Sequence, residues 1–235
     1  GYDVAVHYAS SQVAADAVVA EIRALGCKAQ ALPADLLIEA EMQGLLPAAS
    51  KALGGPLTCL INNASIFEYD NITNATRTSW DRHIESNLRA PLVLTQSFAN
   101  QVPPIKNDKN GEPLAQGLII NLIDQRVKKL TPEFTSYTIA KMGLWALTQT
   151  SAQALAPNIR VNAIGPGPTL KGARQSEEHF ENQRKNTVLG RGSDPSEIVA
   201  AVGYLLNAKS VTGQLICVDG GQHLAWQTPD VLGVE

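Results

Sequence analysis

The sequence predicts an α/β fold, in which a parallel sheet is covered by helices on both faces. Short runs of β-branched and aliphatic residues recur along the chain, and stretches with helical spacing lie between them. This alternation of strand and helix is typical of parallel sheets. The predicted strands are residues 3–8, 28–32, 57–62, 117–123, 159–164 and 214–218.

Two of the helices carry clear end signals. Ser10 or Ser11 is expected to cap the first helix, and Gly26 to end it. Its predicted apolar face consists of Ala14, Val18, Ile22 and Leu25. The segment Asp194-Pro195-Ser196-Glu197 is a capping box with proline at the first helical position, and it predicts a helix that runs toward Leu206.

Composition narrows the class of protein. The chain has 235 residues, 44% of them hydrophobic and 17% charged, so it can bury a sizeable core. A net charge of −3 and a pI near 5.8 argue against a nucleic-acid binder. No apolar stretch is long enough to span a membrane. Three widely spaced cysteines and no signal-peptide pattern favour a reducing, cytoplasmic setting.

The most informative motif follows the fourth predicted strand, which ends at Asp124. Tyr137 comes 13 residues later, and Lys141 lies four residues beyond it. A tyrosine and a lysine with this spacing share one helix face, and a nearby ammonium lowers the pKa of a phenol, whereas the negative charge of Asp124 should raise it. Tyr137 is therefore a candidate general acid. A surface pair without function would show the same spacing.

Two further segments agree with a site at the strand ends. Asn62-Asn63-Ala64-Ser65 ends the third predicted strand, where small side chains and amides would let a flat ligand approach the backbone. An ordinary strand-to-helix turn with asparagine caps is the alternative. Asn87 is a polar residue in a helix that is otherwise well placed for the core, so it needs hydrogen-bonding partners.

With these motifs in view, the chain resembles the short-chain dehydrogenase/reductase family over essentially its whole length. The resemblance implies a single Rossmann-type, doubly wound NAD(P)-binding domain over residues 1–235, with a flexible substrate loop at 167–187. Asn87 would position a water or backbone link to Lys141. The matching segments are Asn62-Asn63-Ala64, Asn87, Tyr137-x-x-x-Lys141, Arg160-Val161-Asn162-x-Ile164-x-Pro166-Gly167, Thr212-Gly213-Gln214 and Val218-Asp219-Gly220-Gly221.

One departure from the general family pattern indicates a branch. Asp124 stands where the family usually has serine, and this looks like the pteridine reductase branch. That branch also shows His7-Tyr8, Phe67 and an insertion at 103–116, which is expected to be a surface loop. The resemblance implies that Phe67 stacks on a pterin and that Asp124 supports proton delivery. Alternatively, Phe67 fills the core and Asp124 is a cap beside Arg126.

A second departure concerns the beginning of the sequence. Family members have a first strand and a glycine-rich turn that holds the cofactor pyrophosphate, whereas this sequence opens in the approach to the second strand. Since that first strand lies in the middle of the sheet, its neighbours would lose a hydrogen-bonding partner. The expectation is that roughly 15 to 30 further residues precede Gly1 in the natural protein.

The cofactor expected from the resemblance is NADPH. An acid at the end of the second family strand would hold the ribose of NAD, but this end carries no acid, and its side chains are His7, Tyr8, Ser10 and Ser11. Asp35 and Leu36 match the adenine contact, although Asp35 could be a simple loop residue. The remaining cofactor contacts implied are Asn63, Ala64, Ser65, Tyr137, Lys141, Pro166, Gly167 and Thr169.

The other histidines and tryptophans receive simpler interpretations. The four histidines share no metal-ligand spacing, and His83 and His179 are expected to face solvent. Trp80 and Trp145 are expected to serve packing or a subunit interface, because the family commonly forms tetramers. The charged segment 171–185 is expected to be a mobile flap at the substrate site.

The sequence thus predicts an NADPH-dependent reductase of a pterin or dihydrofolate-type ring, in which Asp124, Tyr137 and Lys141 form a proton relay. One alternative is a reductase of the same family that acts on a carbonyl, such as a 3-oxoacyl group or a sugar ketone. Another is a regulator that binds NADPH without catalysis. None of these involves a nucleic acid or a membrane.

Overall fold

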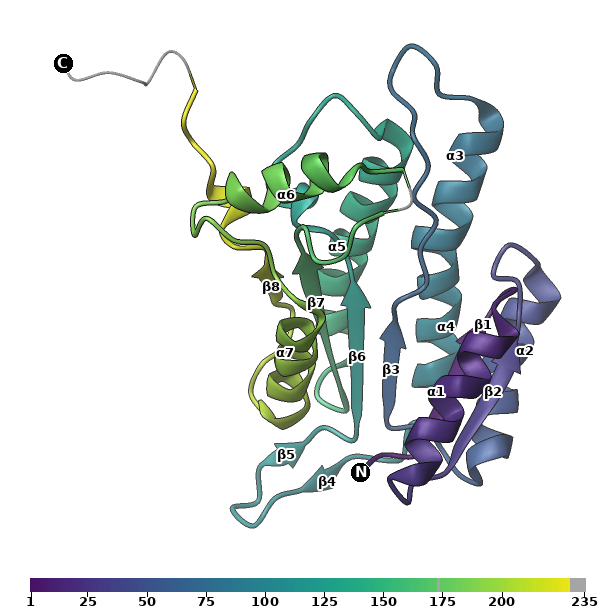
Figure 1. Cartoon of the computed structure of the whole chain (residues 1–235). Coiled ribbons are helices and arrows are strands. Elements are labelled where there is room, and N and C mark those ends of the chain that lie inside the picture. The colour runs from purple at the N-terminus through teal and green to yellow at the C-terminus, as the bar shows by residue number, and fades with distance from the viewer. Residues whose placement is uncertain (173, 229–235) are drawn as a thin grey trace.

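The computed structural model, which describes residues 1–172 and 174–228, contains a parallel sheet in two parts (Figure 1). Two strands form one part, and four strands in the order β3-β6-β7-β8 form the other; all of these pairs are parallel. The predicted strands are all present, with ends shifted by at most two residues. They are β1 Val4–Tyr8, β2 Ala29–Pro33, β3 Cys59–Asn62, β6 Gly117–Leu122, β7 Ile159–Pro166 and β8 Leu215–Val218.

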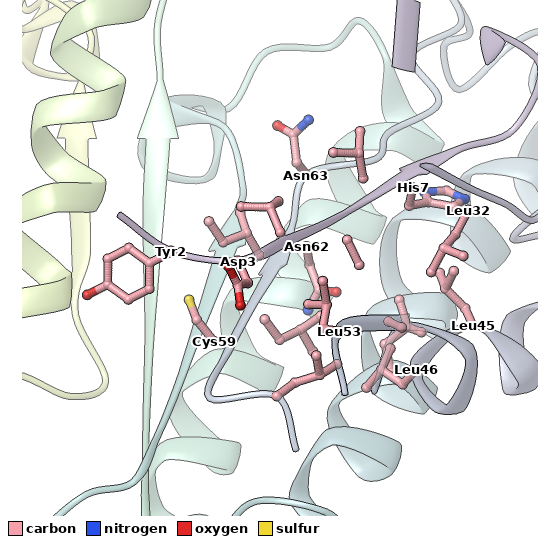
Figure 2. A pocket seen from close by; sticks show the side chains of 18 of the residues that line it. Tyr2, Asp3, His7, Leu32, Leu45, Leu46, Leu53, Cys59, Asn62 and Asn63 are labelled. Atoms are coloured by element: carbon pink, nitrogen blue, oxygen red, sulfur yellow. The ribbon is translucent and has the colours of Figure 1, made fainter. Parts of the chain in front are cut away.

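A cavity of about 820 Å³ separates the two parts of the sheet. Its lining is mainly apolar and comes from β1, α2 and β3, as Figure 2 shows for Leu45, Leu46 and Cys59. No backbone ladder joins β1 to β3 across this space in the described part of the chain. The expected α/β parallel fold is therefore confirmed, and the sheet is interrupted between β1 and β3.

Helices cover both faces of the four-stranded part. Ile119 of β6 packs with residues of α2 and α4 on one face, whereas its neighbours Leu118 and Ile120 pack with Leu205 of α7 on the other. This alternation follows from the two-residue period of a strand. The helices are α1 Gln12–Ala24, α2 Glu39–Leu53, α3 Arg77–Ile84, α4 Ala90–Ala99, α5 Thr135–Leu155, α6 Glu177–Lys185 and α7 Pro195–Asn207.

Helix α7 begins as predicted, since the Glu197 carboxylate accepts a hydrogen bond from Asp194 N. The predicted apolar face of α1 is wrong: Ala15 and Val19 are its buried residues, whereas Val18 and Leu25 are exposed. Val18 lines the cavity beside β1, so its apolar side chain meets open space rather than a packed neighbour.

The segment 103–116 is not only a loop. It contains a small antiparallel hairpin of β4 Lys106–Asn107 and β5 Pro113–Leu114, and its turn includes Gly111 at φ 82°. The Asn-Gly pair in this segment favours such a turn, because glycine adopts positive φ without steric cost. The hairpin lies away from the carboxyl ends of the main strands (Figure 1).

Phe98 offers a test of this packing, because its ring is fully buried in the core between α2, α4 and the sheet. We expect Phe98→Ala to lower the free energy of unfolding by about 3–5 kcal/mol, because it removes a large apolar group and leaves a cavity. Urea unfolding followed by circular dichroism measures this loss. Val13→Ala, at an 85% exposed position of α1, should change stability by less than about 0.5 kcal/mol. Equal losses in the two variants would contradict the assignment of the core.

Candidate active site

Three of the predicted catalytic side chains, Asp124, Tyr137 and Lys141, meet at the carboxyl end of the four-stranded sheet. Helix α6 lies at the same end of the sheet (Figure 1). Asp124 follows β6, and Tyr137 and Lys141 lie on the first two turns of α5. Only 5% of Tyr137 and 2% of Lys141 is exposed, so the two are not a surface pair. In open α/β sheets this edge is the usual place for a ligand.

Asp124 joins two of these elements through its two carboxylate oxygens. The Tyr137 hydroxyl donates to Oδ2 over 3.0 Å, and Arg126 N donates to Oδ1 over 2.7 Å. Both interpretations of Asp124 therefore describe real contacts, since it caps the short 3₁₀ turn Gln125–Lys128 and also bonds the phenol.

Lys141, one turn after Tyr137 on α5, contacts the same end of β6. Its Nζ donates to the Leu122 carbonyl over 2.8 Å and lies 5.7 Å from the centre of the Tyr137 ring. Burial lowers the pKa of Lys141 to about 8, and the Asp124 carboxylate acts in the opposite direction.

Of the two opposing effects expected on the Tyr137 pKa, the raising effect of Asp124 is present in this structure. Burial, followed by the charge and hydrogen bond of Asp124, raises the pKa of Tyr137 well above its ordinary value. Burial likewise raises the pKa of Asp124, although hydrogen bonds and the positive charges of Arg126 and Lys141 oppose this. Tyr137 therefore keeps its proton at neutral pH, which is the form a proton donor requires.

Asn87 is fully buried in the π-helical turn Glu85–Arg89, where its side chain bonds the backbone, and its expected water or backbone link to Lys141 stays a prediction. Its amide nitrogen donates to Ile66 O over 2.8 Å, and its amide oxygen accepts from Ile66 N over 2.9 Å. No hydrogen bond joins Asn87 to Lys141 among the described residues. Asn87 instead fixes the backbone just before Phe67.

Phe67 lies beside Tyr137 and is 45% exposed, so it is not a core filler. Its ring centre is 4.6 Å from that of Tyr137 in an edge-on arrangement, and 4.4 Å from that of Phe134 in a stacked one. Arg174 lies over the Phe67 ring at 5.3 Å and also donates to the Phe67 carbonyl. Phe67 and Phe134 together form an aromatic wall of the site, which is therefore larger than the sequence predicted.

Sequence reasoning missed Phe134 and Arg174. Phe134 adopts φ 58° directly before α5, a conformation that is uncommon for a bulky residue and occurs mostly at constrained sites. Its position three residues before Tyr137 was the one signal available. Arg174 lies in the charged segment 171–185, which was expected at the substrate site, but its individual contact with Phe67 could not be predicted because it joins segments far apart in the sequence.

The residues predicted to contact the cofactor's adenosine end lie at the ends of β1 and β2. His7 Nε2 donates to Ala34 O over 2.8 Å, whereas Tyr8 is half-buried and Ser10 and Ser11 are exposed. Asp35 forms a loop contact, since its carboxylate accepts from Leu37 N over 2.9 Å, and Leu36 is buried. An adenine contact for Asp35 and Leu36 stays a prediction.

The other predicted cofactor residues follow β3 and β7. Asn63, Ala64 and Ser65 are exposed, and the cavity between β1 and β3 extends to Asn63 and Ala64. After β7, a Cβ on Gly167 would lie only 2.5 Å from that of Asp219, so this close approach requires glycine. Pro166 ends β7, and Thr169 shares a hydrogen bond of 2.6 Å with Ser193.

The segment 167–187 contains a regular helix, α6, and residue 173 lies outside the described residues. Arg184 of α6 donates to Pro168 O over 3.0 Å and to Ser193 O over 2.8 Å. These contacts anchor the end of the segment to the loop that follows β7. Its expected mobility stays a prediction.

The expectation for His83 is wrong, and that for His179 is confirmed. His83 is fully buried and contacts Ser136, the residue before Tyr137, whereas His179 is exposed on α6. Solvent exposure was expected because α3 is mostly polar, but its last turn packs against α5. Within the described residues, no three His, Cys, Asp or Glu side chains are placed to hold a metal, and no helix could span a membrane.

Comparison with known proteins places the chain in a family. The family model described as enoyl-(acyl carrier protein) reductase matches residues 1–223. A 3-oxoacyl-[acyl-carrier-protein] reductase of Staphylococcus aureus is 31% identical, over 95% of this chain and 89% of the relative.

Two solved structures are more similar to the chain. FolM alternative dihydrofolate reductase 1 from Brucella suis, in complex with NADP, is 43% identical, with a TM-score of 0.89, over 97% of this chain and 88% of that one. Its counterpart from Brucella canis, also with NADP, is 41% identical, with a TM-score of 0.88, over 99% and 88%. These structures confirm the resemblance to the pteridine reductase branch. The chain therefore belongs to the short-chain dehydrogenase/reductase family of oxidoreductases.

Proposed function

We propose that this protein reduces a pterin or dihydrofolate-type ring with NADPH. The observation that carries the proposal is the 3.0 Å hydrogen bond between Tyr137 and Asp124, with the half-exposed Phe67 ring next to the tyrosine. A phenol and a carboxyl can form hydrogen bonds with the nitrogen atoms of a heterocycle, and a partly exposed aromatic side chain can contact its ring. The NADP-bound Brucella structures, named as alternative dihydrofolate reductases, support the same substrate class.

The residues present fit NADPH. The loop after β1 carries exposed Ser10 and Ser11 without an acid, so nothing there repels a ribose phosphate. Exposed small residues after β3 leave the backbone accessible, and Lys141 offers its buried ammonium to a ribose hydroxyl. When bound, NADPH supplies a hydride.

Residues of the protein then donate the proton to the substrate and replace it. Tyr137 holds its proton at neutral pH and donates it from Oη to a ring nitrogen of the substrate as the adjacent carbon is reduced. Asp124 takes up and returns protons through its hydrogen bond to the phenol, which its raised pKa favours. The three groups act as a coupled set.

A homotetramer and a cytoplasmic location also remain proposals. Several large apolar side chains are partly exposed on α3, α4 and α5, and they support a subunit interface there. These are Trp80, Leu92, Ile139 and Met142.

The reaction itself gives the first test. We expect wild-type protein to oxidise NADPH with dihydrobiopterin or dihydrofolate, and Tyr137→Phe and Asp124→Asn each to lower kcat by about 10²-fold or more, because the proton donor or its partner is lost. Absorbance at the NADPH band measures turnover. Tyr204→Phe, at a 55% exposed position, is the matched control and should retain full activity.

The alternatives give different outcomes in the same assay. The 31% identical 3-oxoacyl reductase favours a carbonyl substrate as the second candidate. Turnover of a 3-oxoacyl thioester or a sugar ketone, with both pterins inert, would replace the proposal. Tight NADPH binding without any turnover, and no effect of Tyr137→Phe, would indicate a regulator.

Cofactor choice gives a second test. Ser10→Asp introduces a negative charge beside the expected ribose phosphate, and we expect it to raise the KM for NADPH by about tenfold while leaving that for NADH nearly unchanged. Ser210→Asp adds the same charge at the opposite end of the sheet and serves as control. An equal effect of both variants on NADPH would argue against a phosphate site at Ser10.

The coupling of Asp124 to Lys141 gives a third test. Asp124 holds the pKa of Lys141 up against burial, which sets it at about 8, so we expect Asp124→Asn to move this pKa further down. An NMR titration of the lysine ε-methylene signals measures the shift. Asp16→Asn, on exposed α1, should leave it unchanged. An upward shift in Asp124→Asn would contradict the proposed electrostatics.

A further inference from the structure

Behind the Tyr137 ring lies a second buried polar cluster that the proposed chemistry does not use. It consists of Asp70, His83 and Ser136, of which no more than 2% is exposed. The three residues come from the loop after β3, from α3 and from α5, so the cluster joins three segments that are far apart in the sequence. The His83 ring centre lies 5.9 Å from that of Tyr137, in an edge-on arrangement.

In this cluster each hydrogen bond fixes whether the next group donates or accepts. Glu68 N is a fixed donor and lies 3.0 Å from His83 Nε2, so Nε2 must accept. The proton of the neutral ring is therefore on Nδ1, which lies 2.6 Å from Ser136 Oγ and donates to it. The Ser136 hydroxyl in turn donates to Asp70 Oδ2. Only the neutral Nδ1–H form of His83 satisfies every partner.

The two ends of this series of hydrogen bonds contact the two sides of the active site, one that carries Tyr137 and one that carries Phe67. Asp70 accepts from Ser136 N over 3.1 Å through its carboxylate and from Phe134 N over 2.7 Å through its carbonyl, which fixes the start of α5 and hence Tyr137. At the other end, the Glu68 amide belongs to the peptide that follows Phe67 directly. The cluster therefore ties the proton donor to the aromatic wall.

Charged groups around His83 favour its neutral form on balance. Burial lowers the pKa of His83, Asp70 and Glu68 oppose this, and Arg82 and Arg174 add to it; Tyr137 also faces the ring. Burial raises the pKa of Asp70, but hydrogen bonds from Ser136 and Ser79 outweigh it and keep this pKa low. A second proton on His83 would point at the Glu68 N–H group and break that link.

We propose that Asp70, His83 and Ser136 are positioning residues. They hold the side chains of Tyr137 and Phe67 in a fixed position relative to each other, and they do so only while His83 is neutral. The inference rests on the proposed function where it takes Phe67 as a substrate contact. The predicted tautomer and the link between the two rings stand apart from the identity of the substrate.

The first experiment needs no substrate. Long-range ¹H–¹⁵N NMR of the imidazole groups in the full chain should show His83 as the neutral Nδ1–H tautomer from pH 8 down to about pH 6, below which exposed histidines are charged. Ser136→Ala should shift the aromatic ¹³C signals of both Tyr137 and Phe67. Thr148→Val removes another buried hydroxyl of α5 and should shift neither. An Nε2–H tautomer, or unshifted rings in Ser136→Ala, would overturn the proposal.

The second experiment uses kinetics with two histidine variants. An asparagine at position 83 places its amide near the position of Nδ1, where it can donate to Ser136 but does not reach Glu68 N, whereas a glutamine places its amide near the position of Nε2, where its oxygen can accept from Glu68 N but its amide does not reach Ser136. We expect Ser136→Ala and His83→Gln to lower kcat by about 10- to 10²-fold, since small misplacements of reacting groups are costly, with the KM for NADPH within about twofold. Thr148→Val should match wild type in kcat.

The pH profile separates positioning from plain stability. As the pH falls below the lowered pKa of His83, the wild type takes up a proton there, whereas an asparagine does not, so the ratio of wild-type kcat to His83→Asn kcat should fall. A constant ratio, or variants that lose thermal stability with unchanged kcat, would show a merely structural role and overturn the proposal. If no pterin turns over, the proposed function fails, and the NMR experiment still decides the tautomer and the link.

Discussion

A buried ammonium group is the constraint around which this site is organised. Lys141 is almost entirely removed from water, and its retained charge needs the Leu122 carbonyl and the nearby Asp124 carboxylate. Both partners lie at the end of β6, so the lysine fixes the position of α5 relative to the end of this strand. Tyr137, one turn earlier on the same helix face, is thereby brought to Asp124.

The same burial sets the chemistry of the phenol. In a site reached by water, Lys141 would lower the pKa of Tyr137, and the proton would be easily lost. Here the desolvation of the phenol and the adjacent Asp124 carboxylate raise the pKa of Tyr137 and outweigh the positive charge of Arg126, so the proton stays on the tyrosine. A carboxylate in place of the usual serine therefore favours the protonated phenol, which is the form that the proposed mechanism requires of Tyr137.

Much of this arrangement could be predicted from sequence, because it is local or follows from strand periodicity. The run 117–123 identifies β6, and the spacing from Asp124 to Lys141 places three groups at one sheet edge. His83 could not be placed, because its burial depends on how α3 meets α5 and not on its own helix pattern. Neither the positive φ of Phe134 nor the contact of Arg174 with Phe67 leaves a trace in local composition.

The two sides of the site are the proton-donating group on β6 and α5 and the aromatic wall. They differ in how they are held in place, and this difference has a consequence for substrate choice. The proton relay stands on β6 and α5, which are fixed by the core of the fold. Phe67 of the aromatic wall lies on the irregular segment 63–70, which side chains of Asn87, His83 and Ser136 hold in place. A family that keeps the first side can therefore change the second through few residues, because an irregular backbone adapts to new partners at little cost to the sheet. Under the proposed function, the residues that anchor segment 63–70 would shape the substrate side of the site, and α5 would carry the proton donor.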